Sequence, residues 1–232
     1  MDDNRPSSSR VVTRGRGTLA DLVRLYDANS PALVQLITAQ DDEQFASAFY
    51  RLLERAVNHL ERNKRDFRTL GETGLTAVVV AGLSVPPFLE TRQEENTNGH
   101  VDLTIETPSC RLQRRILGEA KIYNGPSYHM KGLDQLVGRY STGRESRALI
   151  LMYVRKPEIA QLIEKLEGAM NAERPQRQSG TTVAHSLKWA FTSTHVHSSG
   201  AHIEVVHVGC NLYVEESNES GSLEGRAPGR SN

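Results

Sequence analysis

Three charged side chains interrupt two segments whose sequence otherwise predicts β-strands. Residues 100–106 read HVDLTIE and carry Asp102, and residues 114–122 read RRILGEAKI and carry Glu119 and Lys121. Alternate side chains of a strand lie on one face of its sheet, so Glu119 and Lys121 share a face. Because aspartate is depleted in strands, we interpret the three residues as placed for chemistry. The alternative is an ordinary ion pair on a solvent-facing strand edge.

The chemistry follows from the residue types. If the two strands are neighbours, Asp102, Glu119 and Lys121 converge at one end of the sheet. Two carboxylates a few ångströms apart repel each other unless a cation lies between them, and hard oxygen ligands suit Mg²⁺ or Mn²⁺. A lysine beside the metal could orient or help deprotonate a metal-bound water, or stabilise charge that develops on a phosphate. The pattern therefore predicts a hydrolytic site with Mg²⁺ or Mn²⁺ as cofactor.

The elements that must position these residues follow from the spacing of apolar residues. A period near 3.6 predicts N-terminal helices over 18–40, 41–64 and from about 70 to the Pro86-Pro87 pair. A period of two then predicts strands over 88–95, 99–106 and 114–122. The remaining elements are a helix over 128–140, a buried strand over 146–154, a helix over 156–173, a polar connection to about 185, and closing strands over 187–197 and 202–214. This order predicts an α/β domain with a mixed sheet flanked by helices.

The spacing of the charged residues is similar to a known signature. Asp102, sixteen intervening residues and then Glu119-Ala120-Lys121 resemble the PD-(D/E)xK nuclease superfamily, with Val101 in place of the proline that gives the family its name. The resemblance implies a restriction-endonuclease-like fold, whose core is a helix with an acidic residue, three strands, a helix and a further strand. Residues 67–154 follow that predicted order.

The resemblance also implies individual roles. Glu72 matches the family's helical acid, and Gln135 resembles the glutamine of its Q-x-x-x-Y motif, although Tyr140 follows Gln135 by five residues rather than four. The implied catalytic residues are Glu72, Asp102, Glu119, Lys121 and Gln135. The implied metal ligands are Glu72, Asp102, Glu119 and the carbonyl of Ala120. The implied activity is Mg²⁺-dependent hydrolysis of phosphodiester bonds, of DNA rather than RNA, in phage defence or DNA processing.

Basic residues around the predicted site indicate a surface that contacts phosphates. The chain has 28 basic and 28 acidic residues, so a nucleic-acid partner requires a local patch rather than an overall positive charge. The predicted nucleic-acid-binding residues are Arg114, Arg115, Lys131 and Arg139. The alternative is an ordinary solvated surface.

A zinc site is not favoured near the C-terminal end. The candidate ligands are His195, His197, His202 and His207. His202 and His207 fall on opposite faces of their predicted strand, and no Cys-x-x-Cys accompanies them.

Composition predicts the domain organisation and the compartment. Residues 1–17 read as a disordered basic arm, 18–66 as a helical region packed on the core, 67–214 as the nuclease-like core, and 215–232 as a disordered tail. Two cysteines, a polar N-terminus and no apolar run long enough to span a bilayer predict a cytoplasmic protein without a membrane partner.

The sequence is also compatible with a second function. A protein with a nuclease fold could bind nucleic acid or a partner without cutting, as a subunit of a larger assembly. The helical region over 18–64 favours that alternative, whereas the intact Asp/Glu/Lys set favours the enzyme. A homodimer or a partner subunit is compatible with both.

Overall fold

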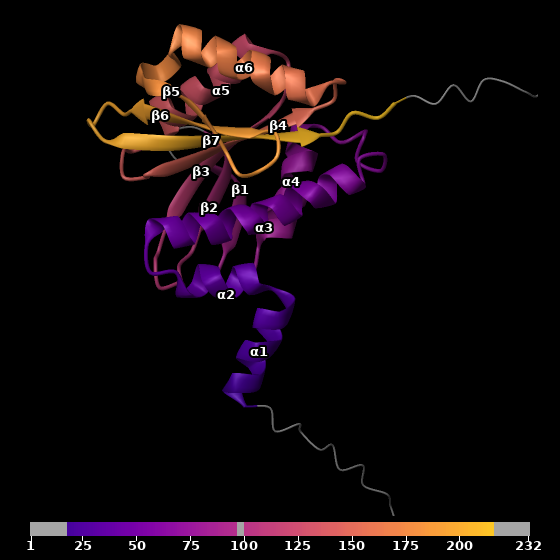
Figure 1. Ribbon diagram of the computed structural model, residues 1–232, viewed down its shortest axis with the longest axis vertical. Helices are drawn as coiled ribbons and strands as arrows, with labels where there is room; N and C mark the ends of the chain where they lie inside the picture. The colour runs from indigo at the N-terminus through magenta and orange to yellow at the C-terminus, as the bar shows by residue number, and fades with distance from the viewer. Residues whose placement is uncertain (1–17, 97–99, 216–232) are drawn as a thin grey trace, which may run out of the picture.

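The computed structural model describes residues 18–96 and 100–215 and contains one mixed seven-stranded sheet (Figure 1). The strand order is β1-β2-β3-β4-β7-β6-β5. The strands are β1 (Glu90–Asn96), β2 (His100–Glu106), β3 (Arg115–Ile122), β4 (Arg147–Val154), β5 (Gln178–Ala184), β6 (Ala190–Val196) and β7 (His202–Asn211). The central pairs β3–β4 and β4–β7 are parallel, and the remaining pairs are antiparallel. The predicted α/β class with a mixed sheet is confirmed.

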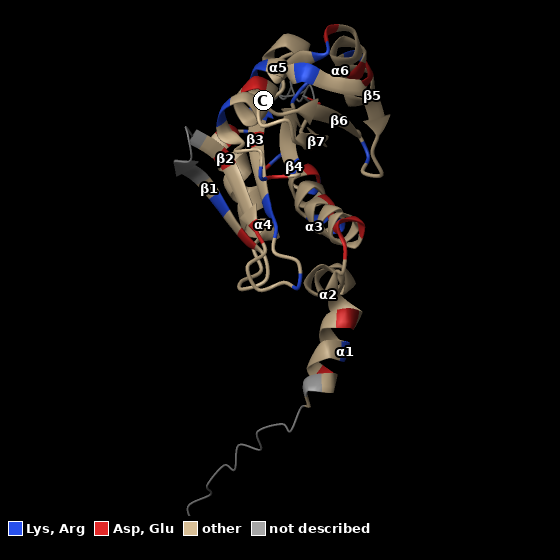
Figure 2. Cartoon of the chain, turned by 90° about the vertical axis from the view of Figure 1, so that its left-hand side faces the viewer, with Lys and Arg blue, Asp and Glu red and all other residues tan. Residues whose placement is uncertain are grey.

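Helices cover both faces of the sheet. The helices are α1 (Leu19–Asn29), α2 (Pro31–Thr38), α3 (Asp42–Arg62), α4 (Glu72–Leu83), α5 (Pro126–Gln135) and α6 (Ile159–Glu173). A π-helical turn, η1 (Leu136–Tyr140), continues α5, and a short 3₁₀ turn, η2 (Pro175–Arg177), follows α6. Helices α3 and α4 lie on one face and α5 and α6 on the other, whereas α1 extends away from the body (Figures 1 and 2).

The central strand β4 shows why the sheet is covered twice. Its side chains alternate between two hydrophobic clusters, and both clusters are buried. Leu149 and Leu151 pack in the cluster that contains α3 and α4, and Ile150 and Met152 pack in the one that contains α5 and α6. A strand buried on both faces reads as a continuous apolar run, as ALILMYV does here.

Two expectations about the elements were wrong. The predicted helix over 18–40 is two helices, because Pro31 occupies the first turn of α2, where its missing N–H is not needed. The predicted connection before residue 185 contains β5, a mostly exposed polar edge strand without the apolar alternation that identifies a strand from sequence.

The predicted basic arm, residues 1–17, and all of the predicted tail, 215–232, except Glu215 lie outside the described residues. Within the part of the chain that the structure describes, no helix is both long and apolar enough to cross a bilayer.

Candidate active site

The candidate site forms where β2 and β3 separate. Their antiparallel register runs from Glu106 opposite Arg115 to Leu103 opposite Gly118 and stops there, although β2 continues alongside β1. Beyond Gly118, β3 therefore turns an unpaired backbone edge toward β2. Backbone N–H groups on such an edge need acceptors from elsewhere.

Two carboxylates occupy that open edge. Asp102 Oδ2 accepts the N–H of Ala120 at 2.9 Å, and Glu72 Oε2 accepts the N–H of Ile122 at 2.9 Å. Glu72 can reach β3 because it is the first residue of α4. The strand that carries Asp102 and the helix that carries Glu72 are thus tied to the same edge through their side chains. The two acids replace the β2 backbone that has diverged.

Lys121 lies at the centre of this group. Its Nζ lies 2.7 Å from Glu119 Oε1, 3.4 Å from Glu72 Oε1 and 3.5 Å from Asp102 Oδ2. The side chain is only 15% exposed, so its charge is held among the three acids rather than in solvent. The structure therefore brings together four of the five predicted catalytic residues, three carboxylates around one ammonium.

Glu119 is the most buried of the three acids. Its side chain is 1% exposed, and its Oε2 atom has no hydrogen-bond partner among the described residues. Burial raises the pKa of Glu119 to about 7, reinforced by the charges of Asp102 and Glu72 and opposed by Lys121. For Lys121, burial acts to lower the pKa, but the three carboxylates outweigh it and the pKa is raised. Lys121 is therefore a permanent cation near neutral pH.

Helix α5 closes the cluster from one face of the sheet. A Cβ added at Gly132 would lie 3.4 Å from Glu119 Cγ and 3.5 Å from Lys121 Cγ. The backbone of α5 therefore lies close to both charged side chains, with room at this position for little more than a methyl group. Sequence reasoning missed Gly132, because an isolated glycine in a helical segment carries no signal of what it faces.

Gln135 and Tyr140, the two residues compared with the Q-x-x-x-Y motif, lie in different surroundings. Gln135 is the last residue of α5, and within the described residues its side chain makes no hydrogen bond with the carboxylate–lysine cluster. Tyr140 is buried, and its pKa is raised by burial and, to a smaller extent, by the charges of Glu119 and Asp102. The π-helical turn η1 adds one residue to the helix and so absorbs the spacing of five.

The predicted phosphate-binding arginines lie elsewhere. Arg114 pairs with Asp42 at 2.6 Å, and Arg115 lies 3.5 Å from Glu106. Arg115 begins β3, whereas Lys121 lies near its end, about 20 Å away at the rise of a strand. On α5 and η1, Lys131 is exposed and Arg139 lies 3.9 Å from Asp134. The structure does not place Arg114 and Arg115 at the carboxylate–lysine cluster.

A buried chain of hydrogen bonds lies on the α5 face of the sheet. The Gln176 carbonyl can only accept, so the Nδ1 of His195, 3.2 Å away, donates to it. Ser193 Oγ then donates to His195 Nε2 at 2.7 Å and accepts from His207 Nε2 at 2.7 Å. His129 Nε2 donates to His207 Nδ1 at 2.8 Å, and this leaves the buried His129 Nδ1 as a lone pair without a partner among the described residues.

This chain of hydrogen bonds includes two of the four histidines that were considered as zinc ligands. Two of the four candidates, His195 and His207, are bridged by Ser193, whereas His197 bonds to Ser199. Burial lowers the pKa of His129 to about 3 and also lowers the pKa of His195 and His207, so all three are neutral at pH 7. Sequence reasoning missed His129, since a single histidine in a helical segment gives no sign of a buried partner.

Whether the cluster suits a metal depends on its donors. Among the described residues, no group of three or more His, Cys, Asp or Glu side chains is arranged to hold a metal ion, and the three acids surround the Lys121 ammonium instead. The donor chemistry nevertheless fits Mg²⁺ or Mn²⁺: three carboxylates, and a buried Glu119 oxygen without a partner. The Ala120 carbonyl is on the open edge, since N–H and C=O of one strand residue share an edge.

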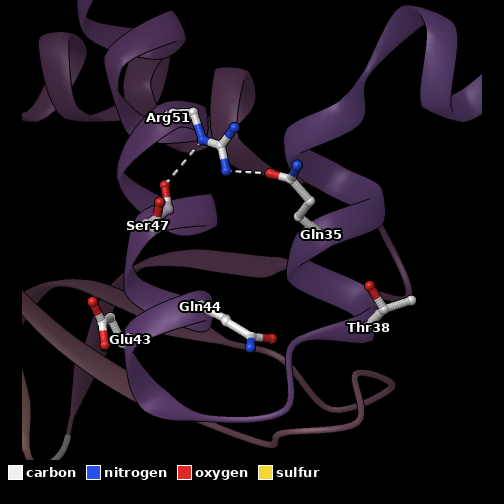
Figure 3. A pocket seen from close by; sticks show the side chains of 6 residues that line it. All are labelled: Gln35, Thr38, Glu43, Gln44, Ser47 and Arg51. Atoms are coloured by element: carbon white, nitrogen blue, oxygen red, sulfur yellow. Dashed lines mark hydrogen bonds between the residues drawn. The ribbon is translucent and has the colours of Figure 1, made fainter.

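A hollow elsewhere lacks such convergence. A cavity of about 410 Å³ lies between α2 and α3, and Figure 3 shows its polar lining. Arg51 is engaged there with the Ser47 carbonyl at 3.2 Å and with the Gln35 side chain. The carboxylate–lysine cluster is therefore the stronger candidate for chemistry.

Comparison with family models, curated proteins and solved structures gave no match for this chain.

Proposed function

We propose that the protein is a Mg²⁺- or Mn²⁺-dependent nuclease that hydrolyses phosphodiester bonds, with DNA as substrate. The observation that carries the proposal is the convergence of Glu72, Asp102 and Glu119 on Lys121 at an open strand edge. Three acids share one ammonium, and one of them, Glu119, is buried, so Lys121 offsets only part of the repulsion between the carboxylates. A divalent cation relieves that repulsion and gives the arrangement a use.

The order of the elements supports a restriction-endonuclease-like fold. Helix α4 carries the first acid, β1 to β3 carry the second and third, and α5 and β4 follow. This is the order implied by the resemblance to the PD-(D/E)xK superfamily. Phage defence or DNA processing would follow from that resemblance.

The side chains have distinct roles in the proposed reaction. Glu72, Asp102, Glu119 and the Ala120 carbonyl would hold the metal, which supplies an activated water and neutralises charge on the phosphate when bound. Lys121 stays protonated because of its raised pKa, so it acts as a fixed positive charge toward a phosphate oxygen and not as the general base. Helix α5 excludes water from the buried side of Glu119.

The test is cleavage of plasmid and single-stranded DNA with Mg²⁺, Mn²⁺ or chelator. Lys121→Ala and Asp102→Ala should each abolish cutting, with losses on the order of a hundredfold or more. Lys165→Ala, which removes an exposed lysine on α6, is the matched control and should cut like the parent. Equal cutting in excess chelator, or by Lys121→Ala, would remove the proposed mechanism.

One observation favours the non-cutting alternative. On α1 the side chains of Leu22, Val23, Leu25 and Tyr26 are 45–61% exposed, and the helix extends away from the body (Figure 2). An exposed apolar helix of this kind suits contact with a partner subunit. If the parent binds DNA but does not cut it with any of the metals, a role as a non-cutting binding subunit replaces the proposed nuclease function.

A further inference from the structure

A basic groove lies at the same end of the sheet as the candidate active site and is lined by none of the arginines predicted from the sequence. It is a surface cavity of about 800 Å³. Its lining residues are Arg65, Arg68, Thr69, Arg155, Leu212, Val214 and Glu215. We refer to it below as the arginine groove. Three guanidinium groups against one acid give it a positive charge in a chain whose formal net charge is zero.

Two of the three arginines are uncommitted. Arg65 and Arg68 lie on the exposed connection between α3 and α4, and neither forms an ion pair or hydrogen bond within residues 18–96 and 100–215. By contrast, Arg114 and Arg147 are ion-paired with Asp42 and Glu204. Free guanidinium groups that line one cavity are suited to bind phosphate oxygens.

The third arginine ties the groove to the active site. Arg155 follows the end of β4, and its guanidinium donates a hydrogen bond to the carbonyl of Leu70. Leu70 lies two residues before Glu72, whose carboxylate binds the backbone of Ile122 at the end of β3. The groove and the carboxylate cluster thus lie at the same end of the sheet and are joined by a short, hydrogen-bonded segment.

The basic surface continues along that end of the sheet. Lys156 follows Arg155 and donates to Asn124 Oδ1 at 3.3 Å. Asn124 comes directly after Tyr123, whose backbone N–H bonds to Tyr153 of β4. Cationic side chains therefore border the ends of β3 and β4 from the groove toward the strand that carries Lys121.

We infer that the arginine groove holds the phosphodiester backbone of the nucleic-acid strand on one side of the bond positioned at the carboxylate cluster. The inference rests on the proposed nuclease function of that cluster. The groove contains no aromatic ring, Asn or Gln among its described lining residues, so its main contribution is the charge that its guanidinium groups offer to phosphates. Binding there is independent of base sequence.

The nearby acids limit how much charge the groove offers. Glu215 is part of the lining, and Asp66 lies exposed between Arg65 and Arg68 in the sequence. Their presence predicts moderate affinity that depends strongly on salt. It also predicts that several linked phosphates bind much better than one.

The test compares the parent with the double variant Arg65→Ala/Arg68→Ala in the full chain, with Ca²⁺ in place of Mg²⁺ so that binding is measured without cutting. The probes are fluorescent homopolymer strands of about 16 nucleotides, whose anisotropy is followed between about 50 and 200 mM salt. The variant should bind about tenfold more weakly at low salt, and its slope of log affinity against log salt should fall by about 1.4. Arg65→Lys/Arg68→Lys should retain most of the affinity, because the charge is kept.

The control removes the same charge elsewhere. Arg24→Ala/Lys165→Ala deletes exposed cations on α1 and α6 and should bind like the parent. Equal affinity and equal salt slope for the arginine variant and the parent would overturn the inference even if the parent cuts DNA. The opposite pattern would be weaker binding by the arginine variant together with a parent that fails to cut DNA whichever metal is added. It would retain the groove as a nucleic-acid site and remove the nuclease proposal.

Two further arms identify the ligand. Inorganic phosphate and a mononucleotide should compete with the labelled strand about a hundredfold less well than an unlabelled strand does. Equal competition by the mononucleotide would show a small-molecule site instead. A large preference for one homopolymer would overturn the independence from base sequence.

Discussion

The pKa of Glu119 gives a direct physical test of the cluster. Glu119→Gln keeps the shape of the side chain and mimics the protonated acid, so Lys121 can retain its contact at Oε1. We expect the variant to be more stable than the parent near pH 8 in the absence of divalent metal. Its cutting activity should be lost, since the amide is a poor metal ligand.

The magnitude follows from the shift. The unfolded chain loses the Glu119 proton near pH 4.5, whereas burial and the charges of Asp102 and Glu72 keep it on the folded protein up to about pH 7. An acid whose pKa is raised by folding destabilises the fold as pH rises between those two values. At about 1.4 kcal/mol per pKa unit, the cost to the parent above pH 7 is about 3 kcal/mol, and the amide avoids it.

The assay is urea unfolding of parent and variant in chelator at several values from pH 4.5 to about pH 8. The difference in the free energy of unfolding should be near zero at pH 4.5 and rise to about 3 kcal/mol above pH 7. Mg²⁺ or Mn²⁺ should then stabilise the parent and have little effect on the variant. Glu164→Gln, an exposed position on α6, is the control and should run parallel to the parent. A constant difference across this range would refute the assigned role of burial.

Three further predictions concern the surroundings of the cluster. Lys121→Met leaves three acids without their cation, so the free energy of unfolding should drop by about 3 kcal/mol near pH 8. Mg²⁺ should restore part of that loss. Urea unfolding with and without metal measures both effects, and an unchanged stability would contradict the prediction. Gly132→Ala should cut like the parent, whereas Gly132→Val should lose about tenfold or more in kcat because its methyls meet Glu119 and Lys121; equal rates for both variants would contradict the close packing of α5. For His129, the pKa is lowered by folding, so its contribution to stability is complete above the unfolded value of 6.5 and is lost below it at about 1.4 kcal/mol per pH unit. His129→Phe should reduce the slope of unfolding free energy between pH 6.5 and 5 by about that amount, and an unaltered slope would contradict burial of the neutral ring.

Local pattern was sufficient to predict the core of the site. Alternating apolar residues located β2 and β3 to within one residue at each end, and their adjacency is confirmed. Strand periodicity also placed Glu119 and Lys121 on one face, where both meet helix α5. These features follow from side-chain direction in an extended chain, which the sequence specifies residue by residue.

Other features depend on spatial relations that no local pattern records. The separation of β2 from β3 leaves the alternation of both strands unchanged, so the role of Asp102 as an acceptor for the Ala120 N–H could not be read from it. Similarly, Arg114 and Arg115 are near Lys121 in sequence but lie along the length of a strand from it. The arginines of the groove come from two separate segments, the α3–α4 connection and the end of β4, and only the fold brings them together.

The π-helical turn at the end of α5 changes what the five-residue spacing between Gln135 and Tyr140 means. With 3.6 residues per turn, a residue five positions after Gln135 falls away from the face shared by residues three and four apart. The turn Leu136–Tyr140 takes up the additional residue, and its last hydrogen bond runs from the Ser141 N–H to the Leu136 carbonyl. Tyr140 ends this turn as a buried residue, and its pKa is raised by burial and then by the charge of Glu119.

The cluster links the stability of the open strand edge to its proposed chemistry. Asp102 and Glu72 stabilise the fold by accepting the N–H groups of Ala120 and Ile122, so neither acid is available only for catalysis. Each of them still directs an oxygen toward Lys121, and the ammonium provides the counter-charge that these acids and Glu119 need in the absence of metal. In the proposed mechanism the same positive charge contacts a phosphate, so the residue that stabilises the free protein would also contact the substrate. Binding of metal would take over the neutralisation and leave Lys121 free for that contact.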